Sequence, residues 1–192
     1  FFFGCVISYL RASNFSDGDS YSVILAFINI IDGGSYTPSR GAYGHPIPEF
    51  LIGFFSYFFG TSISNIFCFS LFFFSIILLF KTFCRNESNL LLFLCLILSN
   101  FFLLFENTNS IDYPIAIFFF SIGLYFLKKE KYLISFVFLG MTIGSRANFL
   151  TFVYPSLIIF FYKEWIKFNF KNLLYSFFVV TFFGLLFYIP LF

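Results

Sequence analysis

The feature that most constrains this chain is a series of apolar runs divided by short polar segments. The runs are rich in phenylalanine, which supplies 39 of the 192 residues. Only 10% of the residues carry a charge, against about 25% in an ordinary soluble domain. A soluble chain with so few charges would expose large apolar areas, which is rare, and disordered chains are apolar-poor. The pattern predicts an integral membrane protein, and the net charge of +2 argues against a nucleic-acid partner.

The predicted fold class is all-α, a polytopic transmembrane helix bundle, because in hydrocarbon a backbone amide must pair within its own segment. Helices are expected at 1–10, 64–80, 90–105, 113–127, 132–145, 148–162 and 173–192. The first run has about half of the roughly 20 residues that a spanning helix requires. We therefore expect 1–192 to be a single transmembrane module that is truncated at both ends.

The basic residues predict which loops share a side of the membrane. The segments 81–89, 128–131 and 163–172 are each separated by two expected helices, and together they hold eight of the 11 basic residues. The positive-inside rule makes their side cytoplasmic. The segment 106–112 and the turn near Arg146 then lie outside.

The side of the first long loop, residues 11–49, depends on the apolar segment that follows it. We expect 50–62 to be an interfacial helix, because its apolar run is short and follows the prolines of His45-Pro46-Ile47-Pro48. The loop 11–49, with its own juxtamembrane helix, then lies outside. If 50–60 crossed the membrane instead, the loop would join the lysine-rich side.

Two carboxylates, Asp17 and Asp19, follow the first run directly. At neutral pH such groups are ionised, with an ordinary pKa of about 3.9, and could accept a proton or hold a cation. The alternative is a solvated turn whose aspartate caps a helix that begins near Tyr21.

Arg146 interrupts otherwise apolar sequence, and an ionisable residue among membrane helices usually faces a partner or a cavity. Its guanidinium suits a phosphate, although an arginine in a short turn that reaches the lipid headgroups is an equal alternative. Glu106 and Asp112 are expected on the same outer face as Asp17, where an ordinary polar turn is the alternative. His45 is the only histidine, and one histidine cannot form a metal site.

The order of these features resembles the multi-span glycosyltransferases of the GT-C fold, including their protein O-mannosyltransferase, aminoarabinose transferase and RgtA/B/C/D-like branches. The resemblance rests on D-G-D-S-Y after the first helix, G-H-P-I-P-E-F-L-I-G-F-F, S-I-D-Y-P-I-A, and G-M-T-I-G-S-R-A-N-F-L. Asp17 matches the family's first aspartate by its distance to Tyr21. Asp19 departs from the pattern, in which the second acid is often adjacent, and Ile47 stands where the family has a second proline.

The resemblance implies a glycosyltransferase that uses a sugar on a polyprenyl phosphate and an unidentified glycan, lipid or protein acceptor. It implies Asp17, with Asp19 in reserve, as the catalytic base. Arg146 would contact the lipid phosphate. The residues expected to bind substrate are Arg146, Asp112, His45, Tyr21 and Glu106. It implies no cofactor, with a divalent metal left open, and a bacterial inner membrane with the active face outward.

Two other classes of protein fit parts of the sequence. A transporter or membrane scaffold would be multi-span, but transporters usually place charges in mid-helix and in repeated halves, whereas these acids lie in loops. An O-antigen polymerase or ligase is also multi-span, with functional arginines typically in large outer loops. Here only Arg11 and Arg40 lie in the large loop.

Overall fold

The computed structural model describes residues 1–14, 18–39, 44–84, 89–100, 107–108, 111–163 and 170–189. Within these ranges every regular element is helical, which confirms the all-α prediction. In chain order the elements are α1 (Phe2–Asn14), α2 (Gly18–Ile31), α3 (Pro46–Phe59), α4 (Thr61–Phe83), α5 (Leu90–Ser99), α7 (Asp112–Lys128), α8 (Tyr132–Ser145), the short 3-10 helix η2 (Ala147–Phe149), α9 (Leu150–Lys163) and α10 (Phe170–Leu186).

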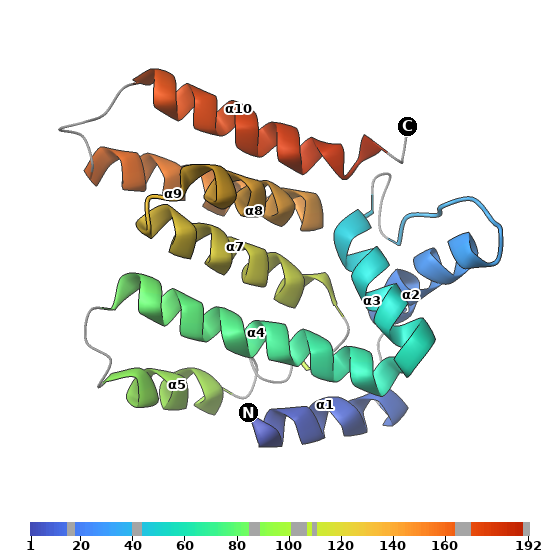
Figure 1. Ribbon diagram of the computed structural model, residues 1–192. Helices are drawn as coiled ribbons and strands as arrows, with labels where there is room; N and C mark the ends of the chain where they lie inside the picture. Colours follow the sequence, from blue (N-terminus) through green and yellow to red (C-terminus); the bar gives the residue numbers. More distant parts are fainter. Residues whose placement is uncertain are drawn as a thin grey trace.

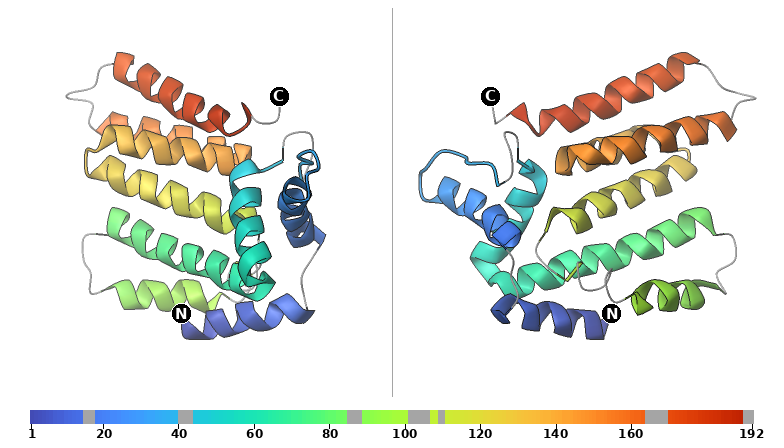
Figure 2. Two further views of the ribbon diagram at one scale, coloured as in Figure 1. Left: turned by 45° about the vertical axis from the view of Figure 1, so that its right-hand side comes forward. Right: turned by 180° about the vertical axis from the view of Figure 1, so that it is seen from behind.

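The helices form two groups that differ in direction. In the first, α4, α7, α8 and α10 lie side by side as a stack, with α1 and α5 along α4 (Figure 1). In the second, α2 and α3 pair with each other and cover one end of the stack (Figure 2). We call this the capped end, marked by His45, Glu49, Asp112 and Arg146. The opposite end, marked by Lys81, Lys128, Lys129 and Lys131, is the lysine end.

Three apolar clusters hold these groups together. One joins α7, α8, α9 and α10 around Leu139, Leu157 and Val180, all fully buried. A second joins the cap to the stack through Ile52 of α3 and Ile115 of α7, which are also inaccessible to solvent. The third packs α1 and α5 against Phe69, Phe72 and Ile76 of α4. The second cluster fixes the cap against the end of α7.

Glycines allow α8 and α10 to approach closely. A Cβ added at Gly140 would lie 2.9 Å from the carbonyl oxygen of Val180, and one at Gly144 would lie 3.2 Å from that of Gly184. Two glycines four residues apart that face a third across the interface form the small-residue packing typical of membrane helices. Any larger side chain at these positions would force the two backbones apart.

The helix expected at 50–62 begins earlier than the apolar pattern predicts, because the prolines of His45-Pro46-Ile47-Pro48 form its first turn. Proline is well suited to that turn, where no intrahelical N–H bond is needed, so α3 begins at Pro46. The chain turns sharply at Gly60, whose φ of 85° favours glycine. As a result α3 runs across the end of α4 rather than alongside it (Figure 2).

Among the described residues, one helix is both long and apolar enough to cross a membrane. This is α4, with 23 residues and a mean hydropathy of 2.4 over its most apolar stretch. At 1.5 Å per residue it is about 34 Å long, slightly more than the hydrocarbon core of a bilayer. The other apolar helices within the described ranges have 10–17 residues.

Candidate functional site

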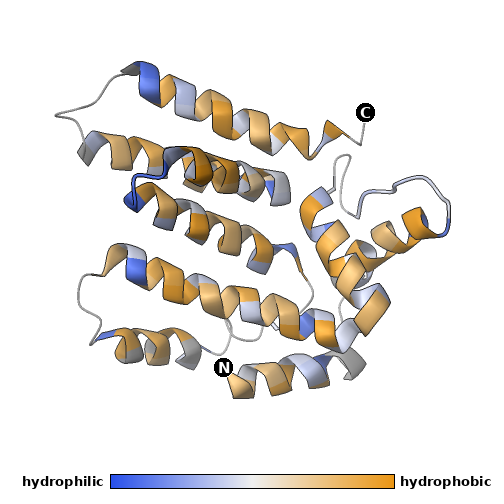
Figure 3. Ribbon diagram, in the orientation of Figure 1, coloured by the Kyte–Doolittle hydropathy of each residue, from blue (hydrophilic) through white to orange (hydrophobic). Residues whose placement is uncertain are grey.

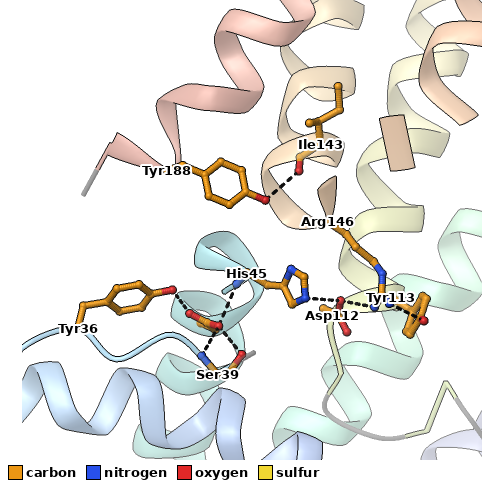
Figure 4. Close-up of polar contacts among 9 residues, drawn as sticks. Tyr36, Ser39, His45, Asp112, Tyr113, Ile143, Arg146 and Tyr188 are labelled. Atoms are coloured by element: carbon orange, nitrogen blue, oxygen red, sulfur yellow. Dashed lines mark hydrogen bonds and ion pairs between the residues drawn. The ribbon is translucent and has the colours of Figure 1, made fainter. Parts of the chain in front are cut away.

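The candidate site lies at the capped end, where the N-terminal ends of α3 and α7 meet the C-terminal end of α8. His45 is the N-cap of α3, Asp112 opens α7, and Arg146 is the C-cap of α8. The backbone explains these positions, since Arg146 leaves the helix in an extended conformation with φ −160° and ψ 110°. Three segments that are far apart in the sequence thus place polar side chains at one location (Figure 4).

An ion pair joins the ends of α7 and α8. Nη1 of Arg146 donates to Oδ2 of Asp112, and Nη2 donates to the hydroxyl of Tyr113 at 2.6 Å. The guanidinium carbon also lies 3.6 Å from the centroid of the Tyr113 ring, a cation–π distance. Three contacts therefore fix the direction of the guanidinium, while the two hydrogen bonds take only two of its five N–H donors.

Asp112 is the most enclosed member of this group, with 1% of its surface exposed. It lies in the first turn of α7, where the partial positive charge of the helix N-terminus stabilises a carboxylate. Nε2 of His45 lies 3.6 Å from Oδ2 of Asp112, the same oxygen that faces Arg146. One carboxylate oxygen thus faces groups from both α3 and α8.

Glu49 forms a second centre on α3. Its carboxylate, also 1% exposed, accepts hydrogen bonds from the Tyr36 hydroxyl, the Ser39 hydroxyl, the Ser39 N–H at 3.0 Å and the His45 N–H at 2.9 Å. All four donors belong to the segment between α2 and α3. The carboxylate therefore holds residues 36–39 and residue 45 of that segment against α3.

Two tyrosines adjoin these carboxylates. Burial, together with the hydrogen bond to Glu49 and its charge, raises the pKa of Tyr36 well above its ordinary value of 10.0. Tyr188, just after α10, has its pKa raised by burial and then by the charges of Glu49 and Asp112. Its hydroxyl donates to the carbonyl of Ile143 at 3.3 Å, so it also ties α10 to the last turn of α8. Both phenols stay protonated at neutral pH.

The structure describes some of the predicted site residues. They bring His45, Asp112 and Arg146 together. Tyr21 lies in the first turn of α2 with 54% of its surface exposed, and none of its described contacts is to these three residues.

Three other predicted site residues lie outside what the structure describes. Asp17 and Glu106 are outside the described residues, and the side chain of Asp19 is outside the described side chains. The predicted catalytic base therefore stays a prediction. Within the described part of the chain, no three histidine, cysteine or carboxylate side chains are placed to hold a metal ion.

Sequence reasoning missed Glu49, Tyr36 and Tyr188 as members of this site. A signal for Glu49 was available, because a carboxylate in the first turn of an apolar helix can accept bonds from the N–H groups there. Nothing in the sequence near Tyr188 distinguishes it from the other tyrosines, since its position depends on how α10 packs.

We found no family model, curated protein or solved structure that matches this chain.

Proposed function

We propose that this chain is a multi-pass membrane glycosyltransferase that moves a sugar from a polyprenyl-phosphate donor to an acceptor hydroxyl at the outer face of the membrane. The single observation that carries the proposal is the meeting of His45, Asp112 and Arg146 at the capped end. These residues come from three of the segments on which the resemblance to GT-C glycosyltransferases rests. Counting helices already places Asp112 and Arg146 at one end of the bundle, but a chance likeness of short motifs gives no reason for His45 to join them or for the contacts among them.

The surface of the stack supports a membrane location for more helices than α4. Large apolar side chains are exposed on α4, on α10 and on the neighbouring α9, including Phe74, Phe152, Ile159, Phe178 and Leu185. Soluble monomers rarely expose so much apolar surface. Several buried hydroxyls bond to the carbonyl four residues earlier in their own helix, as those of Ser75 and Ser121 do at 2.6 and 2.7 Å, which suits helices that have no water to bond. We infer that shorter helices such as α7 and α10 cross with help from aromatic and polar residues at their ends.

Arg146 has the geometry for the anionic part of the donor. Its guanidinium is held by Asp112 and Tyr113, and it keeps further N–H donors for a phosphate oxygen. A fixed positive charge stabilises negative charge that develops during a reaction without having to reorganise. Asp112 would act by orienting this arginine.

The proposed reaction is a direct displacement with inversion. The acceptor hydroxyl loses its proton to Asp17 as its oxygen forms a bond to the anomeric carbon. The bond between that carbon and the phosphate oxygen breaks, and the departing polyprenyl phosphate carries the electron pair and the added negative charge towards Arg146. Asp19 is the reserve for the base.

The test is transfer of radiolabelled sugar from a polyprenyl-phosphate donor in proteoliposomes, with protein amount matched between variants. Asp17→Asn should lower the rate by about 10²–10⁴, because the base is lost while size is kept. Asp19→Asn, the matched control, should lower it less. Arg146→Lys should raise the donor KM and lower kcat, because the charge stays but the planar fork is lost.

A different result separates the alternative classes. Transfer that persists in Asp17→Asn and Asp19→Asn together would contradict the assignment of the base. Wild-type protein that transfers no sugar from any polyprenyl-phosphate donor, but carries a solute across the vesicle membrane, would favour a transporter.

A further inference from the structure

Glu49 occupies a position that the proposed reaction does not use, yet it is among the most buried charged groups described. Its two oxygens have separate partners. Oε1 accepts the two bonds from Ser39 and the bond from the His45 N–H, whereas Oε2 accepts the bond from the Tyr36 hydroxyl. Bonds to an ionised acceptor are roughly twice as strong as neutral ones. The carboxylate therefore fixes the backbone at residue 45 from one oxygen alone.

Gly44 provides an independent sign that the backbone is folded tightly around this carboxylate. Its φ is +59°, in the region that favours glycine, and an added Cβ would lie 2.8 Å from both Oε1 of Glu49 and the Tyr36 hydroxyl. Only glycine at this position leaves space for the carboxylate and its donors. The residue after Gly44 is His45, so both features determine where the histidine begins.

From this fixed backbone the His45 side chain extends away from Glu49 and towards α7. Its Nε2 lies 3.6 Å from Oδ2 of Asp112, which in turn pairs with Arg146 (Figure 4). A continuous series of contacts thus runs from Glu49 through His45 and Asp112 to the guanidinium. Glu49 itself has no described contact with Asp112 or Arg146.

We propose that Glu49 is a positioning residue that holds His45 against Asp112, and so sets the orientation of the Asp112–Arg146 pair for the donor phosphate. The consequence for sugar transfer rests on the function proposed above, whereas the positioning of His45 does not. A role limited to closing the first turn of α3 would stabilise the helix but would leave the His45 side chain where it is. The two roles therefore differ in what happens at Asp112.

Because the chain has a single histidine, the contact between His45 and Asp112 can be measured directly. Full-length protein is labelled with ¹⁵N in histidine and with ¹³C at the aspartate carboxyl, carries a tag without histidine, and is placed in lipid bilayers. Solid-state NMR then detects the dipolar contact between the imidazole nitrogen and a nearby carboxyl carbon. Loss of the signal in Asp112→Asn assigns the contact to Asp112.

Variants at Glu49 and its partners test which of the two carboxylate oxygens maintains the contact between His45 and Asp112. Tyr36→Phe removes the donor to Oε2 only and should keep the contact at wild-type strength. Glu49→Gln keeps one oxygen and should weaken the contact between His45 and Asp112, whereas Glu49→Ala should abolish that contact. Gly44→Ala should also weaken the contact, because the added Cβ displaces the Glu49 carboxylate while the glutamate itself is kept. In the transfer assay Glu49→Ala should lose about tenfold to a hundredfold in rate, as expected when a group is displaced by about 1 Å, and Glu49→Gln should recover part of that loss.

If Glu49→Ala fails to fold, Glu49→Gln and Gly44→Ala carry the test. An unchanged contact in both of these variants would overturn the proposal, and so would its absence from the wild type. A contact that responds as expected in a protein that transfers no sugar would support the positioning of His45 and contradict the proposed function.

Discussion

The two ends of the helix stack treat charge in opposite ways. At the capped end, Glu49 and Asp112 are almost completely buried, and both are enclosed by hydrogen-bond donors. At the lysine end, the ammonium groups lie on the surface. The contrast can be followed in Figure 3, where the strongly hydrophilic positions lie towards the ends of the helices and apolar residues occupy the lengths between them.

The contacts at the lysine end are those of an exposed boundary. Nζ of Lys128 donates to the carbonyls of Thr82 and Lys81 at 2.6 and 3.2 Å, which satisfies the last turn of α4. Lys129 and Lys131 lie 5.8 and 6.0 Å from the ring centroids of Tyr125 and Phe126. These contacts close helix ends and cost little to remove. Burying a charged group costs free energy unless the group is paired. The buried carboxylates of the capped end are therefore held in a fixed polar arrangement, whereas the exposed lysines are not.

The largest difference between the ends should appear in labelling from the outside. Intact cells that carry a single cysteine at Ser35, an exposed position between α2 and α3, should react with a membrane-impermeant maleimide, and cells with one at Lys129 should not. The reason is that the capped end is proposed to be outside and the lysine end inside. The four native cysteines are replaced by serine first, and labelling after lysis controls for expression. Reaction at 129 but not at 35 would reverse the orientation and remove Asp17 from the outer face.

The next effect concerns the cost of breaking the buried pair. Arg146→Met keeps an apolar stem but leaves Asp112 without its strongest partner. Removing one member of a buried pair costs about 3–5 kcal/mol, and the lower value applies because the Arg146 side chain is 13% exposed and His45 stays near Asp112. For a chain of this size the melting temperature should fall by about 6–12 °C, measured by thermal unfolding in detergent. A fall no larger than that of Lys129→Met would show that the pair is not a stabilising element.

The sequence predicts the helices best where charges border an apolar run. The run at 132–145 is flanked by Lys131 and Arg146, and α8 has the predicted bounds. It predicts α3 less well, because Pro46 and Pro48 signal either the end of a run or the first turn of a helix. The close approach of Gly140 and Gly184 depends on which faces of α8 and α10 meet, and no local pattern specifies that.

In the candidate site, too, local sequence patterns do not specify the contacts that depend on helix packing. A common location for Asp112 and Arg146 follows from counting the helices between them, so the sequence could place both on one face. Their direct ion pair could not be predicted, because it depends on how far α7 extends before the chain turns and on the extended backbone at Arg146. Glu49 lies in the loop 11–49 that the sequence places on the outer face, but its role depends on the path of the segment that carries Tyr36 and Ser39.

A smaller effect should distinguish the ends at high pH. The pKa of Tyr36 and that of Tyr188 are raised in the folded protein, so the folded state keeps these protons after the unfolded state has lost them. The free energy of unfolding should therefore fall as the pH rises above about 10, and no such loss should occur below it.

The double variant Tyr36→Phe with Tyr188→Phe should flatten this pH dependence. Tyr162→Phe, at a position with 66% exposure near the end of α9, should keep the wild-type dependence in denaturant titrations between pH 8 and 11, a range chosen around the ordinary tyrosine pKa of about 10. An equal slope in the double variant would mean that the buried phenols do not govern alkaline stability.

The smallest effect is expected at the lysine end itself. Lys128→Met removes a cation from the last turn of α7 and from the C-terminal carbonyls of α4, where a positive charge stabilises a helix by about 0.3–1 kcal/mol. The melting temperature should fall by at most about 4 °C, and raising the salt concentration should reduce even this difference, because exposed charges are screened. Lys129→Met, which has no described bond to α4, is the matched control and should change less. The bond from Lys128 to Lys81 is exposed and the bond to Thr82 is only partly buried, so water can satisfy both carbonyls when they are lost. Asp112 has 1% of its surface exposed, so water has much less access to its carboxylate when Arg146 is removed. A fall in Lys128→Met as large as that in Arg146→Met would therefore show that the lysine end is buried in the native protein, and the distinction between the two ends would not hold.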